Sequence, residues 1–198
     1  MLSPSIQKLI DLFAKFPTVG PRTASRFVFY LIGQPKEKVK EMAQTLIDLK
    51  NNIKLCGLCF NPFENGDESV CPICADPSRD KKTLCVIEKE SDLLSLEKTG
   101  QYKGLYFILG GAVSNLMPEN IQKLRIEELK QRVEKGVFEE IILATNPTTD
   151  GQATSLYLRQ ILKPLAKKIV LLGRGLPLGG ELEYADEETL SSAIENRK

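Results

Sequence analysis

Histidine is absent from the 198 residues of the sequence. This absence excludes Ser-His and Cys-His catalytic pairs and every metal site that depends on imidazole. Long hydrophobic runs are also lacking, because stretches such as 168–172 have the length of a strand and fall far short of the roughly 20 residues that span a bilayer. The first residues, MLSPSIQKL, have no basic flank followed by an apolar core, so no export signal is expected. We therefore expect a cytoplasmic location.

The composition is that of a folded protein with an uneven distribution of charge. Hydrophobic residues make up 42% of the chain, enough for the core of one domain or of two small ones. The formal net charge is only +1, yet residues 1–55 contain nine Lys and Arg against four Asp and Glu. A basic face for a partner such as DNA is therefore expected in the first quarter of the chain.

Residues 5–52 have the apolar spacing of helices. Apolar residues such as Ile6 and Leu9 recur three or four positions apart, which places them on one face of each predicted helix. Pro35 suits the first turn of a third helix. The segment 56–82 lacks regular periodicity and is rich in turn-forming residues, so something other than a hydrophobic core must hold it.

From Thr83 onward, strand-like and helix-like segments alternate. The predicted strands are 83–87, 105–109, 138–144 and 168–172, and the predicted helices between them include 91–99, 126–134 and 154–162. Such alternation is typical of a parallel sheet covered by helices, with ligands at the carboxyl ends of the strands. After Gly173 we expect a loop rich in Gly and Pro, followed by a last helix.

Four of the five cysteines have the spacing of metal ligands. Cys56 and Cys59 form one Cys-x-x-Cys pair, and Cys71 and Cys74 form another after an eleven-residue spacer. Two such turns complete a tetrahedral zinc site, and four sulfur ligands leave no open position for a reacting water, so the zinc should be structural. The alternatives are two disulfides or a thioredoxin-like redox pair. Cys85 lies within an apolar run and is expected to be a buried, inert thiol.

The stretch FPTVGPRTASRF lies between two helical patterns and contains a turn with Gly20. Glycine lets backbone approach a phosphate closely, and the helix that follows begins with free amides at the positive end of its dipole. Arg22 and Arg26 are four residues apart, so they share one helix face beside those amides. The pattern is typical of a hairpin that grips a DNA backbone, although an ordinary helical hairpin with solvated arginines has the same spacing.

Six stretches follow one another along nearly the whole chain: FPTVGPRTASRF, the four-cysteine cluster, CADPSRD, VIEKESDLLSLEKTGQYKGLYFILGG, ILATNPTTDGQATSLYL and RGLPLGGELEYADEETL. Together they resemble the RecR family of bacterial recombination mediators. The resemblance implies an α+β chain of four parts. These are a helix-hairpin-helix region at 1–55, a four-cysteine zinc finger at 56–82, a Toprim-like α/β domain with a parallel sheet at 83–173, and a Walker-B-like tail with a helix at 174–198.

The resemblance also implies a function. It implies a homotetrameric ring that binds DNA and acts with RecO and RecF proteins in gap repair. There it would help RecA to load onto single-stranded DNA coated with single-strand-binding protein. By position, Gly20, Arg22 and Arg26 would contact DNA, and the four clustered cysteines would bind zinc.

The loop after strand 138–144 corresponds to the place where catalytic Toprim enzymes bind magnesium. By resemblance, Glu88 matches the Toprim glutamate, while Asn146 and Thr148 fall where those enzymes have an Asp-x-Asp pair. Magnesium prefers charged oxygen ligands, so an amide and a hydroxyl at these positions predict weak binding. We expect Glu88, Asn146 and Asp150 to form instead a surface for a basic protein partner, with RecO indicated by the resemblance.

An enzyme is the alternative interpretation, as a magnesium-dependent Toprim nuclease or primase-like protein. The neutral residues at the strand end disfavour it, and we expect no catalytic activity. No Gly-x-x-x-x-Gly-Lys-Ser/Thr loop accompanies the Walker-B-like tail. The sequence departs from the family pattern at Thr18, where glycine is usual, and at 150–152, which reads Asp-Gly-Gln where Glu-Gly-Glu is usual.

Overall fold

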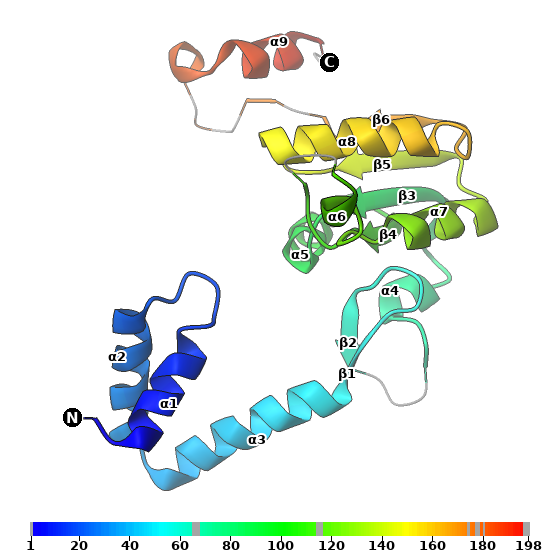
Figure 1. Ribbon diagram of the computed structural model, residues 1–198. Coiled ribbons are helices and arrows are strands. Elements are labelled where there is room, and N and C mark those ends of the chain that lie inside the picture. The colour runs from blue at the N-terminus through cyan, green and yellow to red at the C-terminus, as the bar shows by residue number, and fades with distance from the viewer. Residues whose placement is uncertain are drawn as a thin grey trace. The chain divides into compact units, whose positions relative to one another are not determined.

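A computed structural model describes residues 2–64, 68–113, 117–173, 175–176, 179 and 181–195. The chain divides into two compact units, with the boundary after Ile53 (Figure 1). Among the described residues, no helix is both long enough and apolar enough to cross a membrane.

The N-terminal unit consists of three helices, as the apolar spacing predicts. They are α1 (Pro4–Phe13), α2 (Pro21–Ile32) and α3 (Lys36–Asn52). Prolines begin α1 and α2, where a missing backbone N–H has no intrahelical partner to lose. The first two helices pack through buried Ile10, Ala24 and Val28, whereas no described side chain of α3 is buried.

The turn between α1 and α2 contains a strained residue. Thr18 has a φ of 65°, in the left-handed region that a β-branched side chain rarely occupies. Just after it, the Val19 amide donates to the Phe16 carbonyl at 3.1 Å and closes the turn. The turn therefore keeps a glycine-like backbone although the residue at position 18 is threonine.

The second unit begins with a short, irregular segment. Strands β1 (Ile53–Leu55) and β2 (Pro62–Glu64) pair with each other, and one helical turn, α4 (Pro72–Ala75), follows. Among the residues of this segment that the structure describes, the buried side chains of its core are those of three cysteines and Phe63. This small core agrees with the expectation that hydrophobic packing alone does not hold the segment.

A four-stranded parallel sheet forms the body of the second unit. Its strands are β3 (Asp80–Ile87), β4 (Gly104–Ile108), β5 (Glu140–Ala144) and β6 (Ile169–Leu171), in the order β4-β3-β5-β6. The connecting helices are α5 (Glu90–Lys98), α6 (Pro118–Ile121), α7 (Ile126–Lys135) and α8 (Thr149–Leu162). The alternating pattern therefore predicted the parallel sheet correctly, although α8 begins five residues before the predicted start at 154.

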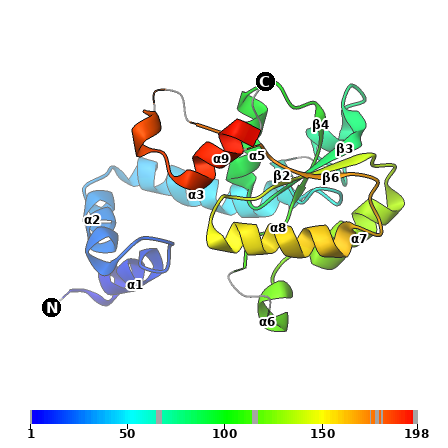
Figure 2. The ribbon, with the colours of Figure 1, turned by 90° about the horizontal axis from the view of Figure 1, so that it is seen from above.

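Helices cover both faces of this sheet (Figure 2). One face packs against α7 and α8 through residues such as Leu129 and Leu158. The other packs against α5 through Leu93 and against the cysteine-rich segment through Ile73, while Phe60 of that segment contacts the side chains of both faces. The cysteine-rich segment is thus part of the cover of the sheet.

The strand order creates a topological switch point between β3 and β5, at the centre of the sheet. The chain leaves β3 towards β4 on one side and later returns to β5 on the other side. Loops diverge at such a point and leave a crevice at the carboxyl ends of the strands. Beyond the sheet, a 3-10 turn (Leu182–Tyr184) and α9 (Glu187–Glu195) agree with the last helix expected in the tail, whereas half of the predicted Gly- and Pro-rich loop at 174–181 lies outside the described residues. The Walker-B-like character of this tail stays a prediction.

We predict that Thr18→Gly stabilises the N-terminal unit by about 1 kcal/mol, because relief of left-handed strain outweighs the greater freedom of glycine in the unfolded chain. Hydrogen exchange of the α1 and α2 amides in the full-length protein measures the change. Thr45→Gly is the control, because Thr45 lies in the interior of α3 and its replacement should lower the protection of α3. Faster exchange in Thr18→Gly would show that the threonine side chain stabilises this turn.

Candidate functional site

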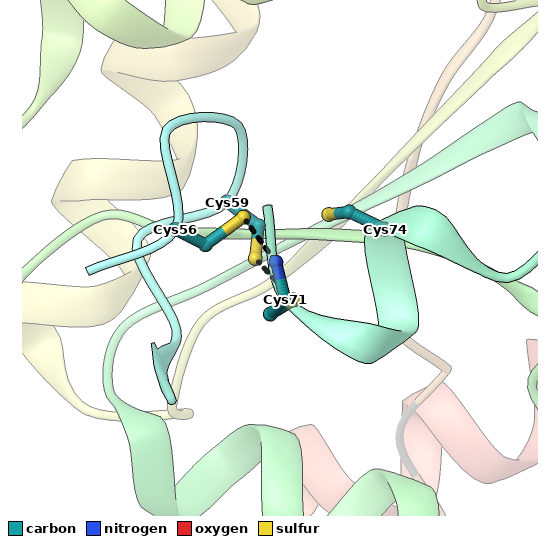
Figure 3. A group of neighbouring side chains, drawn as sticks. All are labelled: Cys56, Cys59, Cys71 and Cys74. Atoms are coloured by element: carbon teal, nitrogen blue, oxygen red, sulfur yellow. Dashed lines mark hydrogen bonds between the residues drawn. The ribbon is translucent and has the colours of Figure 1, made fainter. Parts of the chain in front are cut away.

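Four cysteine side chains converge from two turns of the chain (Figure 3). The sulfur atoms of Cys56, Cys59, Cys71 and Cys74 all lie within 4.8 Å of one another. Four zinc–sulfur bonds of about 2.3 Å in a tetrahedron place the sulfurs roughly 3.8 Å apart. Cys59 Sγ and Cys71 Sγ are 3.5 Å apart, and no cysteine of the chain is in a disulfide. The donor set therefore fits one structural zinc ion.

Backbone amides of the same segment point at the sulfurs. The Leu58 and Cys71 amides donate to Cys56 Sγ at 3.5 and 3.3 Å. The Cys59, Cys71 and Cys74 thiols, and less strongly the Cys71 amide, lower the pKa of the Cys56 thiol against the raising effect of burial. Such donors offset the negative charge of sulfur ligands, since each zinc-bound cysteine is a thiolate. This arrangement suits a cluster that binds a cation better than one whose thiols take part in a reaction.

The cysteine-rich segment is joined to the sheet by the backbone next to Cys59. The Ile108 amide, at the end of edge strand β4, donates to the Cys59 carbonyl at 3.0 Å. Phe60 follows with a φ of 64°, and its ring packs edge-on against Phe107 at 5.5 Å between centroids. The Arg125 guanidinium lies 4.7 Å from the centroid of the same ring. The first cysteine turn therefore forms part of the core of the sheet.

A second connection lies at the exit from the cysteine-rich segment. Arg79 forms a two-pronged ion pair with Glu97 on α5, and Tyr106 of β4 donates to Glu97 Oε1 at 2.7 Å. Arg79 also donates to the Gly104 carbonyl at 3.4 Å. A half-buried pair with additional hydrogen bonds keeps its geometry better than an exposed one. Arg79 thus holds the end of the segment against the sheet edge.

Cys85 lies on β3, away from the cluster. It is buried, and burial raises the pKa of its thiol to about 12. A thiol with this pKa carries almost no thiolate at neutral pH and reacts slowly. The structure therefore agrees with the expectation of an inert core cysteine.

Glu88 and Asn146 meet at the topological switch point of the sheet. Glu88 directly follows β3, and Asn146 lies two residues after the end of β5. Glu88 is 4% exposed. Its Oε1 accepts the Asn146 backbone N–H at 2.7 Å, and its Oε2 accepts the Asn146 side-chain amide, also at 2.7 Å. The Glu88 carbonyl accepts the Gly110 amide at 3.0 Å. Glu88 therefore holds the ends of three neighbouring strands together.

The other predicted residues of this loop begin α8. Thr148 is the N-cap residue, and its hydroxyl accepts the Gly151 amide at 3.1 Å. Asp150 lies in the first turn, half-buried, where a negative charge is favourable. The acidic side chains are not clustered here. Among the described residues, the cysteines are the only group of three or more His, Cys, Asp or Glu residues close enough to share an ion.

The predicted DNA contacts lie at the start of α2. Gly20 is the N-cap residue and makes no side-chain cap, and a Cβ at this position would meet nothing within 4 Å. Arg22 and Arg26 are exposed on the helix that follows. In the part of the chain that the structure describes, neither arginine forms an ion pair with an acidic side chain.

Several important residues were not identified from the sequence. Phe60 and Arg79 act through contacts with residues far along the chain, which no local pattern reveals. For Gly151 the sequence offered only a weak indication of a role, namely a glycine in the first turn of a helix. A Cβ there would lie 2.1 Å from the Asn146 carbonyl oxygen and 2.9 Å from Glu88 Oε1, so the close approach of α8 to the strand ends requires glycine.

The fold and the sites define a class: Toprim-fold proteins that also carry a helix-hairpin-helix and a four-cysteine centre. Family models match the chain at 6–50 (RecR, helix-hairpin-helix), 82–172 (Toprim domain) and 175–198 (RecR, C-terminal).

Whole-chain comparison identifies the particular family. The chain is 45% identical over 194 residues to "Recombination protein RecR" of Dehalococcoides mccartyi (strain ATCC BAA-2266 / KCTC 15142 / 195), covering 98% of this chain and 94% of that protein. Identity is 44% over 193 residues to the protein of the same name from Acidothermus cellulolyticus (strain ATCC 43068 / DSM 8971 / 11B), covering 98% and 96%. The chain belongs to the RecR family of recombination proteins.

We predict about one zinc ion per chain and a requirement for it in folding, because zinc modules of this kind draw on the order of 10 kcal/mol from the metal. Cys71→Ser should lose the zinc, lower the solubility of the protein and speed hydrogen exchange of the Ile108 amide. Cys85→Ser is the matched control and should keep the zinc and the slow exchange. Elemental analysis and hydrogen exchange measure these outcomes. A well-folded preparation without metal would contradict the assignment.

Proposed function

We propose that this chain is a DNA-binding recombination mediator that acts as a ring-shaped clamp and adaptor in gap repair. It would act with RecO and RecF proteins to help RecA load onto single-stranded DNA coated with single-strand-binding protein. The proposed DNA-binding region is 1–55, the zinc finger 56–82, the Toprim domain 83–173 and the tail 174–198. Membership of the RecR family and the exposed arginine pair on α2 are the main support.

DNA binding is proposed for the turn and first helical positions of α2. Free amides at a helix N-terminus attract phosphate, and the N-terminus of α2 has no side-chain cap. Arg22 and Arg26 can add two charge-assisted contacts on the same face, within a region whose net charge is +5 from nine basic and four acidic residues. Contacts of this kind reach the DNA backbone, so binding should be independent of base sequence.

Self-association is proposed through α3 and through the C-terminal tail. Val39, Met42, Leu46 and Leu49 are exposed on α3 at alternating spacings of three and four, the pattern of a helix that packs against another helix. The tail exposes Leu182, Tyr184 and Ile194. Two different two-fold contacts per chain can close a ring of four copies. A homotetramer would bring four DNA-binding hairpins together.

The adaptor role is proposed for the strand-end loop. Asp150 is half-buried in the first turn of α8 and can meet a basic side chain of a partner such as RecO. Glu88 is 4% exposed whereas Asn146 is exposed, so we propose that Glu88 orients Asn146 from beneath while Asn146 and Asp150 contact the partner. The Toprim domain then serves in binding and not in catalysis, because both oxygens of the Glu88 carboxylate already accept hydrogen bonds from Asn146.

The DNA proposal predicts that Arg22→Ala/Arg26→Ala binds all DNA sequences more weakly. The dependence of log affinity on log salt concentration should flatten by roughly two units for each engaged pair. Fluorescence anisotropy over a salt series, with the RecO partner absent and present, measures both quantities.

The control is Lys40→Ala/Lys50→Ala on α3, which removes the same charge from exposed positions of the same unit. This control should change the slope far less, because both lysines lie beyond the first turn of their helix, away from its free N-terminal amides. Equal losses in the two double variants would mean that net charge alone, and not the α2 site, attracts DNA.

The adaptor proposal predicts that Asp150→Lys abolishes binding to a purified RecO partner and leaves DNA binding unchanged. Reversal of one interfacial charge typically costs several kcal/mol when the charges are close. Gln152→Lys, which adds charge nearby without removing the carboxylate, is the comparison. Pull-down and anisotropy measurements test the pair. Full partner binding by Asp150→Lys would place the partner surface elsewhere.

A further inference from the structure

The Glu88 carboxylate has an unusual position for a charged group. It is 4% exposed, and among the described residues no lysine or arginine forms an ion pair with it. A buried carboxylate is strongly unfavourable unless charge or hydrogen bonds compensate it. By resemblance, catalytic Toprim enzymes bind a divalent cation beside the corresponding glutamate, and such a cation compensates carboxylate charge. Here the compensation must come from the protein itself.

Asn146 supplies that compensation with two donors. Its backbone N–H and its side-chain amide lie 2.7 Å from Glu88 Oε1 and Oε2, one donor for each oxygen. Because a carboxylate oxygen can only accept, the amide nitrogen must face it, and the orientation of the Asn146 side chain follows. Hydrogen bonds to an ionised group are about twice as strong as those between neutral groups.

The surrounding loop packs closely against one oxygen of the Glu88 carboxylate. Gly151 approaches so closely that a Cβ there would meet both the Asn146 carbonyl oxygen and Glu88 Oε1. Thr145 donates to the Gly151 carbonyl at 2.9 Å, and the Thr148 hydroxyl accepts the Gly151 amide at 3.1 Å. An octahedral ion with its bound waters needs several oxygens directed at one centre. The residues at this strand end therefore do not fit a magnesium site.

We propose that Asn146 is a positioning residue whose amide takes the place of a divalent cation beside Glu88. It makes the strand-end loop and the start of α8 independent of metal. A corollary is that the single change Asn146→Asp converts this loop into a metal-dependent one. That change removes the amide donor and sets a second carboxylate against Glu88, a repulsion that a divalent cation relieves. The inference does not depend on partner or DNA binding.

The test compares the thermal unfolding of zinc-loaded full-length proteins in buffer depleted of other divalent ions. Asn146→Asp should unfold on the order of 5 °C below the unchanged protein. Millimolar Mg²⁺ or Mn²⁺ should restore at least half of the loss, compared with sodium chloride of matched ionic strength. The unchanged protein should not respond. Zinc content is measured throughout so that loss of zinc is not mistaken for an effect at the loop.

A swapped pair provides the control. In Glu88→Gln/Asn146→Asp the amide and the carboxylate exchange places, so a hydrogen bond can form again with one negative charge in total. This double variant should unfold close to the unchanged protein and should not respond to Mg²⁺ or Mn²⁺. An Asn146→Asp protein that is insensitive to metal, or a double variant no more stable than Asn146→Asp, would overturn the proposal.

The Asn146 side-chain amide of the unchanged protein offers a second test, which does not require Asn146→Asp to fold. Of the two side-chain amide protons of Asn146, the one donated to Glu88 Oε2 should exchange with solvent more slowly than the other in nuclear magnetic resonance spectra. Sub-millimolar Mn²⁺ should leave their resonances sharp, because no ion binds beside Glu88. Fast exchange, or strong broadening of these resonances by Mn²⁺, would show that the amide does not occupy the place of the cation.

Discussion

The hydrogen bond from the Ile108 amide to the Cys59 carbonyl joins the cysteine-rich segment to the parallel sheet of the second unit. On one side of this bond lies the cysteine cluster, whose four sulfur atoms lie close enough together to hold one metal ion. On the other side lies the edge strand of the parallel sheet, whose core includes Phe60 from the same cysteine turn. We therefore expect metal binding at the cluster to stabilise the end of β4, because the Cys59 carbonyl and the Phe60 ring belong to the same cysteine turn.

The same sheet positions the strand-end loop. Glu88 follows β3 and Asn146 follows β5, and parallel pairing in register brings these strand ends together. The loop keeps the position of a Toprim metal site but uses an amide where such a site uses a cation. A surface built in this way has a constant shape and charge whatever the magnesium concentration, which suits the proposed adaptor role.

Much of this architecture could be predicted from local sequence. Strands, helices and the metal centre follow from periodicity and from the two Cys-x-x-Cys pairs, because hydrophobic spacing and ligand spacing are local properties. The hydrogen bonds between Glu88 and Asn146 could not be predicted, since they join residues 58 positions apart through strand register. For the same reason, the ion pair of Arg79 with Glu97 and the position of Phe60 became visible only in the structure. The effect of threonine in place of glycine at position 18 could not be predicted either. Only the backbone φ shows that Thr18 keeps the left-handed conformation of the turn.

We propose that this member of the RecR family assembles into a ring that binds DNA. Native mass spectrometry of the zinc-loaded protein, with and without a DNA duplex that carries a single-stranded gap, tests it most directly. We predict a species of four chains, each with one zinc ion, and a second species in which four chains hold one DNA molecule. Monomers alone at micromolar concentration, both with and without DNA, would contradict it.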